Sequence, residues 1–222
     1  MKKRFLGLAV AASVAISLFG VGTASAADAT LNVVHGIPGV DVNVCVNGGE
    51  AIPDFSFGEV VTGVALPAAS YDVKVVAATD DCMGSAILEA TGVELMDGRN
   101  HTAVAYLMED GTPTLGLYKN ASRPVARGAA WLFVRHNAAA PAVDVWANGK
   151  SLVADLENGE TAKAIVPRGI YAAWVSLPGD YQPVIGPAVL RLKKGFTYEI
   201  YAIGDATSGF DFAVVATQVG SK

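Results

Sequence analysis

The sequence predicts an all-β protein built from two tandem antiparallel β-sandwiches, and three observations support this. Hydrophobic residues make up 52% of the chain and charged residues only 17%, so a large apolar surface must be buried. Apolar and polar residues alternate with a period of two, which is typical of strands. The chain also matches itself when it is displaced by about 101 residues, which indicates an internal repeat.

Residues 1–26 have the layout of a secretory signal peptide. Lys2, Lys3 and Arg4 precede an uncharged apolar run, and Ala24-Ser25-Ala26 forms a small-residue cleavage pattern. The run is long enough to span a bilayer, so a retained anchor is the alternative. We expect cleavage after Ala26, and therefore an exported protein, periplasmic or extracellular, with no stable membrane span after cleavage.

The repeat divides the rest of the chain into two modules. Leu31, His35, Asn47-Gly48 and Gly58-Glu59 match Leu132, His136, Asn148-Gly149 and Gly159-Glu160 at an offset of 101, Tyr71 matches Tyr171 at 100, and Gly98 matches Gly195 at 97. Small changes of offset fit single-residue gaps in surface turns. We therefore expect a first module at 27–122, a short linker at 123–126 and a second module at 127–222.

The strands follow from alternation and turn residues. Val42, Val44 and Val46 face one way and Asn43 and Cys45 the other. The Asn-Gly pair that follows them suits a tight hairpin, and the second module repeats it. Further strands are expected at 59–66, 70–77, 86–95, 100–107 and 114–119, and at 160–166, 170–177, 186–192, 196–203 and 211–217. Seven or eight short strands per module are typical of an immunoglobulin-like sandwich.

Two motifs carry a family resemblance. The segments VVHGIPGVDV (33–42) and VRHNAAAPAVDV (134–145) resemble the opening of the DUF4397 family, and Phe57-Gly58-Glu59, 66–71 and 167–171 resemble a later segment of it. Asn158 stands where the second copy of that segment would have Phe. The resemblance covers nearly all of the chain after residue 26, as two copies. It implies an exported, often tandem, β-rich module, and it transfers no catalytic residue because the family has no assigned activity.

The repeated histidines are the most suggestive candidates for chemistry. His35 and His136 each precede a Pro-containing loop and an Asp, which are Asp41 and Asp144. One His per module supplies no set of three or four metal ligands, so we expect each to hydrogen-bond to the loop that follows it. Together with Tyr71 and Tyr171, these residues are interpreted as a structural repeat motif. We predict no catalytic residue, no metal site and no cofactor; the alternative is a metal-dependent or hydrolytic enzyme using His35 or His136.

Cys45 and Cys82 both lie in the first module. In an oxidising compartment they are expected to form a disulfide. Because Cys45 lies on the face opposite Val42 and Val44, the bond would fasten the 78–85 loop across an outer face. Trp146 occupies the position that matches Cys45 in the second module. We therefore expect the disulfide to be a local cross-link that the fold itself does not require.

Charge distinguishes the modules. Residues 27–222 carry 13 basic and 21 acidic residues, and almost all of the excess lies in 27–126, which hold 4 and 13. This balance disfavours a nucleic-acid partner. The sign reverses at two equivalent positions, where Glu94 and Asp97 correspond to Arg191 and Lys194. These edges are expected to dock, within one chain or between chains, unless they are merely solvated surface.

All three Trp lie in the second module, and alternation places Trp146 and Trp174 on a face directed away from the core. Exposed aromatic side chains can stack on sugars or bind a protein, or they can cover a sandwich edge or the interface between the modules. We therefore expect a non-enzymatic binding or structural protein with an envelope protein or a glycan as its partner. A small-ligand carrier with a pocket between the modules is a further alternative.

Overall fold

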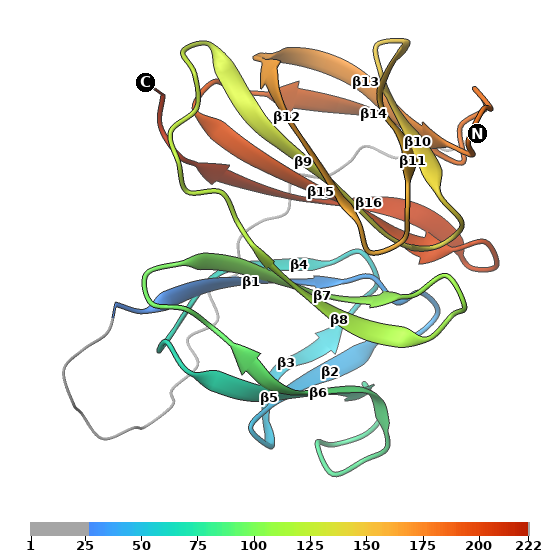
Figure 1. The fold of residues 1–222 in the computed structure, drawn as a ribbon. Coiled ribbons are helices and arrows are strands. Elements are labelled where there is room, and N and C mark those ends of the chain that lie inside the picture. The colour runs from blue at the N-terminus through green and yellow to red at the C-terminus, as the bar shows by residue number, and fades with distance from the viewer. Residues whose placement is uncertain (1–26, 222) are drawn as a thin grey trace.

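The computed structural model describes residues 27–221, and the expected signal peptide lies outside them. The described chain is all-β, with strands grouped into two sandwich-like modules (Figure 1). The first module contains β1 (Ala29–His35), β2 (Val42–Val46), β3 (Gly49–Phe55), β4 (Val60–Leu66), β5 (Ser70–Ala77), β6 (Ala86–Glu94), β7 (Asn100–Leu107) and β8 (Pro113–Lys119). The second contains β9 (Ala129–Ala139), β10 (Val143–Ala147), β11 (Lys150–Leu156), β12 (Thr161–Pro167), β13 (Gly169–Ser176), β14 (Ile185–Leu192), β15 (Phe196–Asp205) and β16 (Gly209–Gln218).

Each module consists of two four-stranded sheets. In module one the strand orders are β4-β1-β7-β8 and β3-β2-β5-β6, and in module two they are β12-β9-β15-β16 and β11-β10-β13-β14. This confirms the all-β sandwich class. One detail differs from the expected antiparallel pattern, because β1 pairs in parallel with β7 and β9 with β15. The two strands of each pair are separated in sequence by the whole of the other sheet, so a parallel alignment is sterically open to them.

The two modules repeat residue by residue. His35 lies opposite Ala105 in the first and His136 opposite Ala202 in the second. The Asn-Gly turns adopt positive φ in both copies, as a tight hairpin requires. Asp41 and Asp144 do not occupy equivalent positions, however. Val42 and Val143 occupy the same position against β3 and β11, so the equivalent of Asp144 is Asn43.

Each sandwich has its own apolar core. The core of module one includes Val42, Val44, Phe55, Val75 and Leu88, with a second cluster around Leu66 and Tyr71 near one end. The core of module two is one larger cluster that contains Leu132, Val145, Val175, Leu192 and Ile200. These residues alternate with outward-facing ones along each strand, as expected for half-buried strands.

A third apolar cluster joins the modules. Sheets β4-β1-β7-β8 and β12-β9-β15-β16 lie toward each other in the centre of the molecule (Figure 1). The cluster comprises Val34, Val104, Tyr106, Tyr201, Ile203, Ala213 and Val215, with Phe57, Val60 and Tyr118 packed against it. The modules are therefore held by buried side chains and not by the linker alone.

A buried ion pair lies within the same interface. Arg135 Nη1 is 3.0 Å from Glu199 Oε2, and both side chains are almost completely buried. The Tyr201 hydroxyl donates to the same carboxylate oxygen at 2.9 Å. The Arg135 guanidinium also lies 4.4 Å from the ring centre of Tyr118, which belongs to module one. Burial raises the pKa of Glu199, and the charge of Arg135 opposes that shift.

Two loops reinforce the contact from opposite sides. Phe57 of module one packs into the shared cluster. Its equivalent, Asn158, donates to the Leu107 carbonyl of module one at 3.2 Å and to the Ala138 carbonyl at 2.6 Å. The change from Phe to Asn in the second motif thus replaces an apolar contact between modules with a polar one.

The expected docking of charged edges within the chain is wrong. Glu94, Asp97, Arg191 and Lys194 are all exposed, and no ion pair joins them in residues 27–221. The modules meet instead through the outward faces of two sheets, where more apolar surface can be buried. Within the same residues, no helix has the length and hydrophobicity needed to cross a membrane.

Candidate functional site

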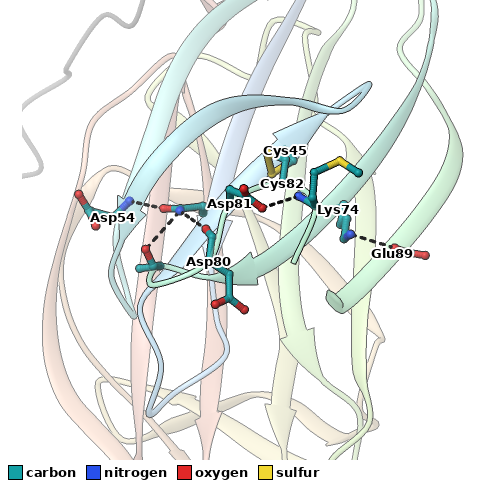
Figure 2. The surroundings of a disulfide bond; sticks show 10 residues. Cys45, Asp54, Lys74, Asp80, Asp81, Cys82 and Glu89 are labelled. Atoms are coloured by element: carbon teal, nitrogen blue, oxygen red, sulfur yellow. Dashed lines mark hydrogen bonds and ion pairs between the residues drawn. A yellow bond between two sulfur atoms is a disulfide. The ribbon is translucent and has the colours of Figure 1, made fainter. Parts of the chain in front are cut away.

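The outer face of β2 and β5 carries a disulfide. Cys45 on β2 is bonded to Cys82 in the loop that follows β5 (Figure 2). The bond and its placement across an outer face were predicted from the sequence, and both are confirmed. Beside it, Lys74 on β5 pairs with Glu89 on β6 at 3.8 Å. On this face of module one a disulfide therefore holds the loop after β5, and a charged pair lies beside it.

The equivalent face of module two carries aromatic rings. Trp146 stands where module one has Cys45, and Trp174 stands where it has Lys74. The two indoles lie 8° from parallel with ring centres 6.0 Å apart. Tyr181, from the β13–β14 loop, meets both edge-on at 5.0 and 5.1 Å. We call Trp146, Trp174 and Tyr181 the aromatic cluster.

The exposure of this cluster differs from the expectation. Trp174 is only 8% exposed, because the β13–β14 loop lies over it, so the expectation of an exposed Trp174 is wrong. Trp146 is half-buried and its Nε1 donates to the Ser176 hydroxyl at 2.9 Å. Tyr181 is 53% exposed. The solvent-exposed part of the cluster therefore consists of Tyr181 and part of Trp146, with Trp174 packed beneath them.

One polar position holds the covering loop in both modules. In module one Asn43 accepts from the Asp54 N–H at 2.9 Å and donates to the Asp80 carbonyl at 2.9 Å. In module two the Asp144 carboxylate accepts from the N–H groups of Asp155 at 3.0 Å and Gly179 at 3.1 Å. Asn43 was not singled out from the sequence. Its position in register with Asp144 at an offset of 101 was the available signal.

The repeated histidines are buried at the ends of β1 and β9. His35 Nε2 is 2.9 Å from the Val40 carbonyl, and His136 Nε2 is 2.9 Å from the Pro141 carbonyl. In each case a backbone N–H two residues on also approaches Nδ1, at 3.4 Å. The expected hydrogen bond to the following loop is confirmed in both modules. Burial lowers the pKa of both imidazoles.

A family model for a domain of unknown function, DUF4397, matches residues 29–146. The match runs from β1 through the whole of module one to β10 of module two. The chain belongs to the DUF4397 family. A comparison with curated proteins gave no match.

The repeated tyrosines of this DUF4397 protein secure a corner of each sandwich. The Tyr71 hydroxyl donates to the Pro67 carbonyl at 2.8 Å, and the Tyr171 hydroxyl donates to the Pro167 carbonyl at 2.7 Å. Each bond closes the turn that leads into the strand carrying the tyrosine. No group of three or more His, Cys, Asp or Glu side chains suited to a metal ion occurs among residues 27–221.

Proposed function

We propose that this DUF4397 protein is an exported, non-enzymatic binding or structural module of the cell envelope or extracellular space. Its contact surface is the aromatic cluster of module two. The observation that carries the proposal is the partial exposure of Tyr181 and Trp146 above the buried Trp174. Aromatic residues are enriched at binding surfaces because they bury a large area at little entropic cost.

Two features support export. Residues 1–26 combine a basic start, an apolar run and a small-residue cleavage pattern. Cys45 and Cys82 form a disulfide, and such bonds persist chiefly in oxidising compartments. Periplasm and external medium both satisfy these requirements.

The surroundings of the histidines support a non-catalytic role. His35 and His136 are buried, and the Nε2 of each is engaged by a carbonyl of its own loop. A general base must reach the proton that it abstracts, and a buried imidazole held by its own loop is poorly placed to do so. The space between the modules, which a small-ligand carrier would need, is occupied by the apolar cluster and the ion pair.

A glycan array combined with a pull-down from envelope extract tests the proposal. The wild-type protein is expected to retain a glycan or an envelope protein, and Tyr181→Ala is expected to lose it. Lys74→Ala, at the equivalent face of module one, serves as the matched control and should bind normally. Retention by Tyr181→Ala equal to that of the wild type would contradict the assignment of the surface. A hydrolytic activity that is lost in His35→Gln or His136→Gln would contradict the non-enzymatic role.

A further inference from the structure

The end of module two next to the linker is basic. Three turns meet there, since the Arg168 N–H donates to the Gly128 carbonyl and the Gly195 N–H to the Ala129 carbonyl, both at 2.9 Å. The hairpin after β10 reaches the same end, because the Asn148 N–H donates to the Ala172 carbonyl at 2.8 Å. This basic end exposes Arg127, Lys150, Arg168, Arg191, Lys193 and Lys194.

The equivalent end of module one is acidic. The Gly98 N–H donates to the Ala27 carbonyl at 3.1 Å and the Leu95 N–H to the Ala69 carbonyl at 2.9 Å, so the corresponding turns meet again. This end exposes five acidic residues, Asp28, Glu50, Asp72, Glu94 and Asp97, and two basic residues, Arg99 and Lys119, so its net charge is negative. An open groove of about 450 Å³ lies between 68–70 and 92–97, with Glu94 and Asp97 among its lining residues.

Both ends lie on the linker side of the molecule. Asn120, where the linker leaves module one, donates its N–H to the Asn100 carbonyl at the start of β7, at 2.9 Å. Val125, where the linker enters module two, donates to the Gly220 carbonyl at 3.2 Å. One side of the protein therefore presents an acidic half and a basic half, and no ion pair joins them within residues 27–221.

Apolar side chains accompany the basic end. Ile170, directly after the Arg168 turn, is 59% exposed, and Val189, which lies near Arg191 on β14, is 61% exposed. Exposed apolar residues rimmed by charges are typical of an interaction surface. They can supply affinity, whereas the charges steer the encounter and fix its register.

We propose that two copies of this chain associate about a two-fold axis through the linker side, so that each acidic end meets the basic end of the other copy. The two-fold rotation exchanges the two copies, so module one of each copy faces module two of the other. Both contacts then form at once and the assembly is closed. A second copy fits better than an anionic lipid surface, because the acidic half on the same side would be repelled by lipid. The inference is independent of the aromatic cluster and of its ligand.

Sedimentation velocity of the purified protein tests this directly. A discrete dimer is expected at an ionic strength of about 0.01 M, and its dissociation constant should rise about tenfold or more at about 1 M, where the screening length falls to about 3 Å. A monomer at every concentration and ionic strength would overturn the proposal. Growth into longer chains would overturn the closed two-fold arrangement.

Charge-reversal variants identify the surfaces. Glu94→Lys with Asp97→Lys, and Arg191→Glu with Lys194→Glu, are each expected to be monomeric, and their equimolar mixture is expected to form a heterodimer. Glu109→Lys with Glu157→Lys makes the same charge change in turns at the far end and should leave the dimer intact. Failure of the mixture to associate would overturn the pairing. Binding of the monomeric wild type to vesicles containing anionic lipid, lost in the Arg191→Glu, Lys194→Glu variant, would replace the second copy with a membrane.

Discussion

The outer faces of the two modules hold equivalent loops in different ways. In module one, Cys82 fastens the loop after β5 to Cys45, beside the Lys74–Glu89 pair. In module two, Tyr181 fastens the corresponding loop by packing against two stacked indoles. In both modules a loop is thus held over this face, by a covalent bond in module one and by aromatic packing in module two. The aromatic solution leaves Tyr181 and part of Trp146 exposed, and these rings form the proposed binding surface.

The faces between the modules differ as well. Arg135 and Glu199 of module two occupy the positions that Val34 and Thr102 occupy in module one. A buried charge left without its partner is costly, whereas replacement of both charges can be nearly neutral. The module-one residues Val34 and Thr102 therefore indicate which substitutions can replace Arg135 and Glu199 together.

Arg135→Val should have the largest effect on stability, about 3–5 kcal/mol, because it leaves Glu199 buried and unpaired. The pKa of Glu199 is already raised by burial, so the penalty for its ionised form grows as pH rises above the ordinary carboxyl range. Urea denaturation at acidic and neutral pH measures both effects. Arg135→Val with Glu199→Thr, the two residues of module one, should recover most of the loss; equal stability of the single and double variants would contradict this.

Loss of the disulfide should come next. Cys45 and Cys82 are 37 residues apart, and opening this loop costs about 4 kcal/mol on the chain-entropy model. The expected result for Cys45→Ala with Cys82→Ala is a lower denaturation midpoint in urea. A reductant should lower the midpoint of the wild type to a similar value and leave the double variant unchanged. A wild type that is insensitive to the reductant would show that the disulfide does not stabilise the fold.

The buried histidines are a feature that the two modules share, so they should respond to pH in the same way. Burial lowers the pKa of His35 and His136, so below the unfolded pKa of about 6.5 the unfolded chain binds protons that the folded chain does not. Stability should therefore fall as pH decreases from about 7 toward 5, by at most about 1.4 kcal/mol per pH unit for each histidine. Thermal melts across this range should show a shallower slope in His35→Gln and in His136→Gln. Identical slopes in wild type and variants would contradict the assignment.

Removal of the Tyr181 ring should have the smallest effect on stability. Tyr181→Ala loses two edge-on aromatic contacts, each worth about 0.5–1.5 kcal/mol, while the half-exposed ring gives up little other burial. Tyr181→Phe keeps both contacts and is the control. Chemical denaturation should separate the two variants, and equal stability would indicate that the loop is held without the aromatic contacts.

Much of the fold could be predicted from the sequence because its signals are local. Alternation at period two located the strands, and the repeat offsets placed His136 and Tyr171 in register with their counterparts. The packing of the modules was not predicted, because Arg135 and Glu199 are charged residues of the kind normally found in contact with solvent. A signal was nevertheless present: Ile200-Tyr201-Ala202-Ile203 in β15 is an apolar stretch without alternation, which is typical of a strand covered on both sides.

The candidate site was predicted only in part, for a related reason. Alternation assigns Trp174 to the outer face but carries no information about a loop that covers it. The disulfide was predictable because it needs only two cysteines and an oxidising compartment. The contact of Tyr181 with both indoles depends on the path of the β13–β14 loop, which no local pattern determines.

Co-sedimentation with an insoluble envelope fraction tests most directly the central claim, that binding belongs to the aromatic face of module two. The wild type and Lys74→Ala should pellet equally with the fraction, whereas Tyr181→Ala and Trp146→Ala should remain in the supernatant while retaining folded circular dichroism spectra. Equal pelleting of all four proteins, or a loss confined to Lys74→Ala, would contradict it.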